Sequence, residues 1–308
     1  MPHIYPPAAP TITGNVLTIS RFLNNPMTVQ RRLRTLAENR FIADVLLSGR
    51  YEVAGGALLY EQSESIYTDK APEAVNAGGE YPRAPATPGP AALAGVVKWG
   101  QDVPITDEHV KRYGRRAVDV SLTKITNYMV KQVDSVALAV IAAAVTQTAA
   151  AVGGGGWSGA SADPLLDLML AKAAVVANDQ GYDPNVAVMA DVSYARLIAN
   201  SKIIAGLARE SDTSVTRTGD VLNVAGLDIL PTNNLPVATT CFVMDTTMTG
   251  GIGYERLESP EYQGDPANGV ESWIRRDPSA NDQWIVRGRR PVVPIVQEPG
   301  AIYKITAV

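Results

Sequence analysis

Two stretches of the chain contain residue types that could do chemistry. Glycine-rich turns such as residues 153–156 can present backbone amides to a phosphate group. A phosphate-binding loop of this type continues with Lys and then Ser or Thr, whereas this one continues with Trp157. We therefore expect a flexible hinge at these glycines and no nucleotide site.

The second stretch is acidic. Glu61, Glu64 and Asp69 could form a paired-carboxylate site for general acid and base catalysis, which needs two carboxyl groups with different pKa values. These acids lie in a polar segment with several prolines and glycines, where nothing is expected to desolvate them. Salt bridges to basic residues of another chain are the better interpretation, and we expect no catalytic residues here.

Histidine and cysteine are scarce. His3, His109 and Cys241 are the only residues of these types, so a zinc site or a serine-type triad has almost no material. We expect Cys241 to be a buried thiol in an apolar strand, and His109 to be an exposed helix residue rather than a pH switch. The sequence therefore predicts no metal site, no cofactor and no enzyme activity.

Composition narrows the function classes further. The 308 residues carry a net charge of −4, which argues against a dedicated nucleic-acid-binding domain. The N-terminus lacks the basic start and apolar core of a signal peptide. The longest apolar run, residues 136–145, is well short of the roughly 20 residues that span a bilayer. We expect no membrane segment.

A long polar segment at residues 55–85 has no obvious support of its own. It opens with the strand-like run ALLY and then alternates acids, prolines and paired glycines. Together with a second strand-like run at residues 91–105, it predicts a two-armed ribbon over residues 51–105. An isolated hairpin is marginal, and ordering each residue costs about 1 to 2 kcal/mol. We infer that the ribbon packs on another chain.

Helix signals flank this ribbon. Asn25 and Pro26 predict the start of a helix that ends near Gly49. Thr106 predicts the cap of a long helix that runs to about Ala150 and that Gly114 can interrupt early. Its apolar residues recur at steps of three and four, as in one helical stripe. The stripe consists of Val118, Leu122, Ile125, Met129, Val133, Val136 and Val140.

Residues 157–250 alternate between helix and strand patterns. Asp163 and Pro164 predict the start of a helix that ends near Gly181, a buried strand follows at residues 186–190, and Asp191 is expected to cap a short helix. This alternation indicates a compact α/β domain. The tail returns to strands in VESWIRR, DQWIVRGRRPVVPIVQEP and AIYKITAV.

Four stretches in this order resemble the major capsid proteins of tailed bacteriophages, which have the Hong Kong 97-type fold. ALLYEQSESIYTDKAPEAVNAGGEYP is similar to the family's extended loop, and VKWGQDVPITDEHVKRY to its return strand and the start of its spine helix. VAVMADVSYARLIAN and AGLDILPTNNLP resemble parts of the axial domain, and DQWIVRGRRPVVPIVQEPGAIYKI resembles the final peripheral strands.

The resemblance implies an α+β fold with four parts. They are an N-terminal arm at residues 1–50, an extended β-hairpin loop at 51–98, a peripheral domain with the spine helix at 99–152 and 251–308, and an axial α/β domain at 153–250.

The resemblance also implies a function and partners. Copies of the chain would assemble as hexamers and pentamers into an icosahedral virion capsid, formed in the bacterial cytoplasm, that encloses double-stranded DNA without sequence-specific binding. A portal and a separate scaffolding protein are expected partners, a decoration protein is an additional candidate, and we expect the chain not to be processed. The alternative is an encapsulin-like shell that encloses protein cargo.

Two sets of residues are expected to contact neighbouring subunits. The loop set is Tyr60, Glu61, Glu64, Tyr67, Asp69, Lys70, Glu80 and Tyr81. The set in the arm and closing strands is Arg31, Arg32, Arg34, Arg287, Arg289 and Arg290. These arginines could instead face DNA, although protein contacts are the better interpretation. Lys70 is the one loop lysine that could form a covalent cross-link, which we do not expect because no partner asparagine is evident.

Overall fold

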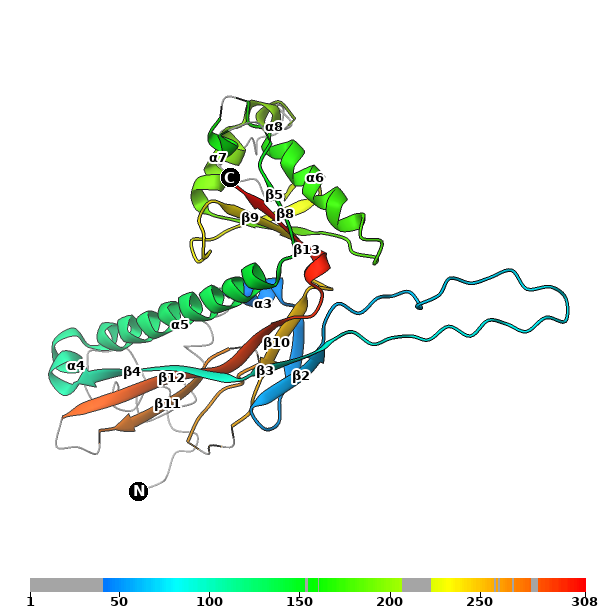
Figure 1. The fold of residues 1–308 in the computed structure, drawn as a ribbon. Helices are drawn as coiled ribbons and strands as arrows, with labels where there is room; N and C mark the ends of the chain where they lie inside the picture. The colour runs from blue at the N-terminus through cyan, green and yellow to red at the C-terminus, as the bar shows by residue number, and fades with distance from the viewer. Residues whose placement is uncertain are drawn as a thin grey trace, which may run out of the picture.

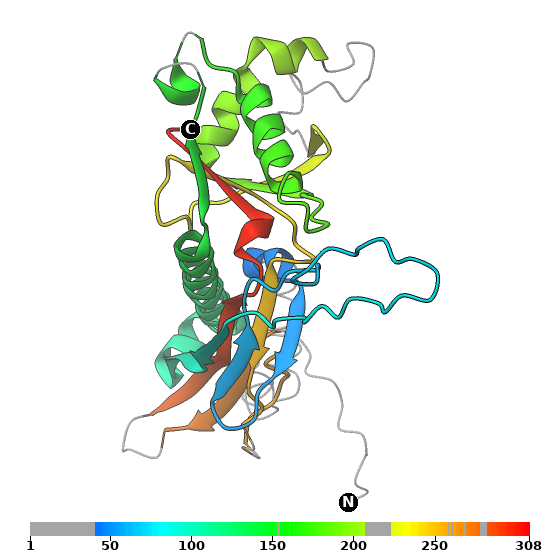
Figure 2. The ribbon, with the colours of Figure 1, turned by 45° about the vertical axis from the view of Figure 1, so that its right-hand side comes forward.

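The computed structural model shows two bodies and one long projecting loop (Figures 1 and 2). It describes residues 41–152, 155–159, 161–206, 223–257, 259, 261–267, 269–277 and 282–308. The expected arm, including Arg31, Arg32 and Arg34, therefore lies mostly outside the described residues.

The elongated body is built on a five-stranded sheet. Its strands are β1 (Gly49–Glu52), β4 (Val97–Thr106), β10 (Gly250–Tyr254), β11 (Glu271–Arg276) and β12 (Gln283–Val296). The order is β1-β10-β12-β11, and β4 pairs with β12 as well. The long strand β12 therefore organises this body, since it runs antiparallel to β4 from Gln283 opposite Thr106 to Val292 opposite Val97.

A long helix covers one face of this sheet (Figure 1). Thr106 caps α4 (Asp107–Tyr113) by accepting a hydrogen bond from the His109 amide at 3.3 Å, as expected. Gly114, at φ 60°, then separates α4 from α5 (Arg115–Ala144). A Cβ added at Gly288 of β12 would lie 2.7 Å from the Ile125 side chain, so this glycine permits close helix packing.

The predicted apolar stripe of α5 is buried over its first half. Val118, Leu122, Ile125, Met129 and Val133 are all buried, whereas Val136 and Val140 are only half-buried. Beyond residue 133 the buried positions are Ala137, Leu138 and Ile141. The buried stripe thus shifts by one residue beyond Val133, from the expected Val136 and Val140 to Ala137 and Ile141.

The helix ends earlier than predicted. α5 stops at Ala144, and residues 147–150 form strand β5 (Gln147–Ala150), which pairs in parallel with β13 (Ile302–Thr306). Alanines favour a helix locally, but pairing with β13 places this segment in a sheet instead. The prediction of a helix to residue 150 is wrong at this end.

The second body is a six-stranded sheet with helices. Its strand order is β5-β13-β9-β6-β8-β7. The remaining strands are β6 (Val186–Met189), β7 (Asn223–Val224), β8 (Leu227–Pro231) and β9 (Thr240–Met244). The helices are α6 (Pro164–Val176), α7 (Asp191–Ala199) and α8 (Ser201–Gly206), with short 3-10 turns at Gly156–Ser158 and Pro299–Ala301.

Several local predictions for this body hold. Asp163 accepts a hydrogen bond from the Leu166 amide at 3.4 Å and caps α6, with Pro164 in its first turn. Strand β6 is buried along its whole length, as predicted. Asp191 is the first residue of α7 rather than its cap, which is Ala190.

The last strand differs from the expectation. Residues 302–308 were expected to join the peripheral strands, but β13 pairs with β5 and β9 in the second sheet. The boundary strand β5, expected with the spine helix, lies there too. Main-chain pairing with β5 and β9 determines which sheet β13 joins. The alternating pattern of a strand's side chains does not reveal which strand it will pair with.

The two-stranded ribbon is shorter than the predicted range of residues 51–105. Strands β2 (Ala57–Glu61) and β3 (Ala91–Gly95) form a two-stranded sheet, whereas β1 and β4 on either side belong to the five-stranded sheet. Residues 62–90 run out from this root as a long loop that projects from the body in both views (Figures 1 and 2).

The start of the described chain packs beside helix α5, the predicted spine helix. Helix α3 (Ile42–Leu46) ends three residues before Gly49, which begins β1 rather than stopping the helix. Phe41, Ala43, Leu46 and Leu47 are buried in the same core as α5. The predicted earlier part of this helix lies outside the described residues.

Candidate assembly surfaces

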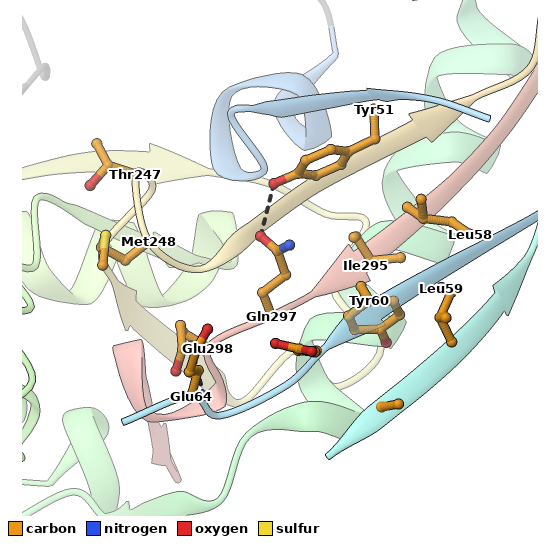
Figure 3. Close-up of a pocket in the computed structure, with 12 residues that line it drawn as sticks. Tyr51, Leu58, Leu59, Tyr60, Glu64, Thr247, Met248, Ile295, Gln297 and Glu298 are labelled. Carbon is orange, nitrogen blue, oxygen red and sulfur yellow. Dashed lines mark hydrogen bonds between the residues drawn. The ribbon is translucent and has the colours of Figure 1, made fainter. Parts of the chain in front are cut away.

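The root of the loop borders a pocket of about 610 Å³ (Figure 3). Tyr51 donates a hydrogen bond to Gln297 Oε1 at 2.8 Å on one wall. The apolar lining comes from Leu58, Leu59, Tyr60, Met248 and Ile295, and the acidic lining from Glu61, Glu64 and Glu298. Tyr60 is half-buried here, and Glu61 is exposed.

The first part of the loop is held by its own chain. The amides of Ser63 and Glu64 donate to the Gln297 carbonyl at 2.9 Å and to Glu298 Oε1 at 3.2 Å. The Ile66 amide donates to Gln180 Oε1 at 3.0 Å. A hydrogen bond to Asp179 raises the pKa of the exposed Tyr67 hydroxyl. Residues 62–67 are therefore fixed to the body.

The distal loop, residues 68–87, is supported differently. Its amide at Asp69 donates to the Pro85 carbonyl at 3.1 Å, Thr87 donates to Asp69 Oδ2 at 2.5 Å, and Lys70 pairs with Glu73 at 2.6 Å. Within residues 68–87, every hydrogen bond and ion pair found among the described residues joins two loop residues. Glu80 and Tyr81 are exposed, Tyr81 by 81%. The distal loop therefore projects from the body without a surface of its own chain beneath it.

Three predicted arginines lie on β12, and only one remains available at the surface. Arg287 makes a two-point ion pair with Asp102, with Nε–Oδ1 at 2.5 Å and Nη2–Oδ2 at 2.6 Å, and these contacts raise its pKa. It also lies over Trp273, 4.9 Å from the ring centroid. Its side chain is 40% exposed.

Arg289 and Arg290 are buried within their own subunit, whereas the expectation was that they contact a neighbour. Arg289 pairs with Glu271 at 2.6 Å, and both side chains are 7% exposed. Arg290 is completely buried and pairs with Asp44 at 2.8 Å. The Arg290 guanidinium, which has no exposed surface and is paired inside its own subunit, is not free for a salt bridge to the loop of another.

Arg290 belongs to a buried charged cluster that the sequence did not reveal. Asp134 of α5 accepts hydrogen bonds from the amides of Ala43 at 3.0 Å and Ile42 at 3.4 Å, at the first turn of α3. Burial raises the pKa of Asp134 to about 6, although the two amides and Arg290 act in the opposite direction. The only sequence signal for this cluster was an acidic residue, Asp134, directly after Val133 of the predicted apolar stripe. The cluster fastens the start of the described chain to the spine helix.

Asp134→Asn is expected to remove a pH dependence of stability. Between about pH 4 and 6 the folded chain holds a proton on Asp134 that an unfolded chain has released, since an unperturbed Asp has a pKa of about 3.9. The contribution of Asp134 to the free energy of unfolding therefore falls as pH rises through this window, by up to about 3 kcal/mol.

Urea unfolding of both proteins from pH 4 to 7 measures this effect. The difference between wild type and Asp134→Asn should change with pH across the window and flatten above it. A difference that stays constant from pH 4 to 7 would contradict the assignment.

The remaining candidates for chemistry have structural roles. Trp157, which follows the glycine run, donates from Nε1 to Asp167 Oδ2 at 2.7 Å and is buried. Cys241 is buried as predicted, which raises its pKa, and His109 is exposed as predicted. The described residues contain no cluster of three or more His, Cys, Asp or Glu suited to a metal ion. Among the helices that the structure describes, none has both the length and the apolar character needed to cross a bilayer.

Solved structures share this fold at low sequence identity. A virus-like particle protein from Pyrococcus furiosus is 11% identical, with 91% of this chain and 98% of that chain covered and a TM-score of 0.59. The capsid of cyanophage P-SCSP1u gives 15% identity, 86% and 88% coverage and a TM-score of 0.60. The mature capsid of bacteriophage PhiM1 gives 10%, 85% and 86%, and 0.58. These matches confirm the predicted Hong Kong 97-type fold.

The family is shown by the sequence itself. No curated protein matches the chain. The family model described as phage capsid protein matches residues 91–305, from the start of strand β3 into strand β13, which is well over half of the chain. The chain therefore belongs to the phage capsid protein family and is a major capsid protein with the Hong Kong 97-type fold.

Proposed function

We propose that copies of this chain assemble as hexamers and pentamers into a closed icosahedral shell around double-stranded DNA. The observation that carries the proposal is the distal loop, residues 68–87, whose polar contacts lie within the loop itself. Ordering an extended segment costs about 1 to 2 kcal/mol per residue, so the loop needs a surface that its own subunit lacks. The neighbouring subunit of a shell supplies one.

The two bodies and the loop would have separate positions in such a shell. We assign the five-stranded sheet with α5 to the peripheral domain and the six-stranded sheet to the axial domain at capsomer centres. Each contact can then be weak, because several contacts to different neighbours act together. The same assignment makes the chain a structural protein without catalytic activity.

We further propose the partners that this role requires. They are a portal, a separate scaffolding protein, and DNA held without sequence recognition, with assembly in the host cytoplasm; a decoration protein on the outer surface is an additional candidate. The net charge of −4 supports confinement of DNA rather than tight binding to it.

Electron microscopy of the expressed chain and of native particles, with extraction of their contents, tests this function. The expected result is icosahedral shells, filled with DNA in the native particles. Shells filled with protein instead of DNA would identify a nanocompartment and contradict the proposal. Native particles that lack the chain altogether would contradict it as well.

A further inference from the structure

A small pocket lies on the face of the five-stranded sheet that is turned away from α5. It has a volume of about 330 Å³ and lies between β4, β12 and the segment that precedes β11. A Cβ at Gly288 would point at Ile125 of α5, so the neighbouring side chains of β12 belong to the opposite face. These are Arg287 and Arg289, which line the pocket together with Lys98, Gly100, Asp102 and Tyr262.

The glycine at position 100 keeps this pocket open. In the register of β4 and β12, Gly100 lies opposite Arg289, and Lys98 and Asp102 lie on either side of it on the same face. A Cβ at Gly100 would lie 3.3 Å from the Arg289 Cβ and would fill the space beside that side chain. Tyr262 lines another side, because the residue that follows it is bridged to β11.

Arg289 gives the pocket a donor without an acceptor. Its Nε donates to Glu271 Oε2 at 2.6 Å, and its guanidinium carbon lies 3.4 Å from the centroid of the Tyr262 ring. The side chain is only 7% exposed, yet no described residue accepts a hydrogen bond from the buried Nη2. A buried guanidinium nitrogen without an acceptor is costly, so the site favours a ligand that brings an oxygen.

Two further donors border the pocket. The ammonium group of Lys98 is exposed, and no hydrogen bond or ion pair joins it to a described residue. The Tyr262 hydroxyl accepts from Arg287 Nη1 at 3.3 Å, and its own proton has no acceptor among the described residues. Both carboxylate oxygens of Asp102 already accept from Arg287. The pocket therefore has a surplus of hydrogen-bond donors.

The charges at the pocket favour one small anion. Three cationic side chains face two carboxylates, so one positive charge remains beside the free donors. These groups are Lys98, Arg287, Arg289, Asp102 and Glu271. An anion with several oxygens can accept from all three free donors and thereby join β4, β12 and the segment that precedes β11. We propose that this pocket binds a single small oxyanion of the phosphate class.

Free phosphate suits the pocket better than the backbone of a nucleic acid does. Asp102 and Glu271 lie beside the two arginines, and their carboxylates would repel the phosphates that flank a bound one in a polymer. A free phosphate has no such neighbours. The inference does not depend on the proposed shell function, because all the residues that form the pocket belong to one chain.

Thermal unfolding of the full-length chain at rising phosphate concentration tests the site. Chloride replaces phosphate so that ionic strength and pH stay constant. A ligand that binds only the folded chain raises the unfolding midpoint along a binding curve, whereas the general salt effect of phosphate on burial is common to all variants. We expect a specific rise for the wild type, and calorimetric titration with inorganic phosphate should show saturable binding.

Two variants remove single donors and leave the fold intact. Tyr262→Phe keeps the ring against Arg289 and removes only the hydroxyl, and Lys98→Met changes an exposed side chain, so both should unfold in chloride as the wild type does. Each is expected to weaken phosphate binding by about 10- to 100-fold, because each removes one hydrogen bond to a charged ligand. Lys131→Met, at an exposed lysine of α5, is the matched control and should bind phosphate normally.

The outcomes separate a phosphate site from its alternatives. Saturable binding that both variants weaken, and that a short DNA duplex does not displace, would support the proposal. Equal effects of phosphate on the wild type and on all three variants would overturn it. Displacement of phosphate by the duplex, lost in Lys98→Met, would identify a nucleic-acid backbone site and also overturn it. None of these readouts needs assembled shells, so a negative result here would leave the proposed function intact.

Discussion

A chain in which Asn-Gly replaces residues 70–84 is expected to fold normally and to form no shells. The replacement joins Asp69 to Pro85, whose backbone hydrogen bond of 3.1 Å already closes the two arms at that level. A two-residue Asn-Gly turn matches antiparallel arms. The two bodies should be unaffected, because the polar contacts of the removed residues lie within the loop or with Thr68 next to it.

The expected loss of assembly is large because the loop is one of several cooperating contacts. Removing one contact from a multivalent assembly lowers its apparent affinity by about 10²- to 10⁴-fold. We therefore expect shell yield to fall at least about 100-fold in sedimentation and electron microscopy, with an unchanged unfolding midpoint. Lys70→Ala is the matched control, since it removes only one exposed ion pair and should assemble. Normal shells from the shortened chain would refute the role of the distal loop.

Arg290→Met is expected to destabilise the folded chain by about 3 to 5 kcal/mol. Arg290 is completely buried, and its Nη2 lies 2.8 Å and 3.0 Å from the two carboxylate oxygens of Asp44. Its guanidinium also lies 4.3 Å from the centroid of the Phe41 ring. Methionine fills much of the space but leaves Asp44 beside Asp134 without this compensating cation.

Urea unfolding compares this variant with Arg287→Met on the same strand. Arg287 pairs with Asp102 at the surface, so its loss should cost no more than about 1 kcal/mol. Adding Asp44→Asn to Arg290→Met should recover part of the loss, because it removes a carboxylate that then has only the longer ion pair with Arg50, at 3.3 Å. Equal effects of the two arginine variants would show that the buried cluster does not hold α3 to the spine helix.

Local sequence signals predicted much of the fold. Thr106 and Asp163 are caps because their side chains accept amides three residues along the chain, which sequence spacing encodes directly. Gly114 interrupts the long helix at a positive φ that glycine tolerates. The order of the elements, read together with the family resemblance, then predicted the architecture that the matching structures share.

What the sequence could not predict depends on contacts between distant segments. The cluster of Asp44, Asp134 and Arg290 joins residues up to 246 positions apart, so no local spacing reveals it. The same limit explains the two buried arginines. From the sequence, RGRR is typical of a basic surface patch. In the structure Arg289 and Arg290 lie on opposite faces of the strand, where they are buried and pair with the distant residues Glu271 and Asp44. Pairing of β13 with β5 and β9 is also a long-range choice.

Cryo-electron microscopy of assembled particles, at a resolution that traces the main chain, tests the central claim most directly. The account predicts that residues 68–87 of each subunit lie against a neighbouring subunit. A closed shell in which these residues touch only their own subunit or solvent would contradict it.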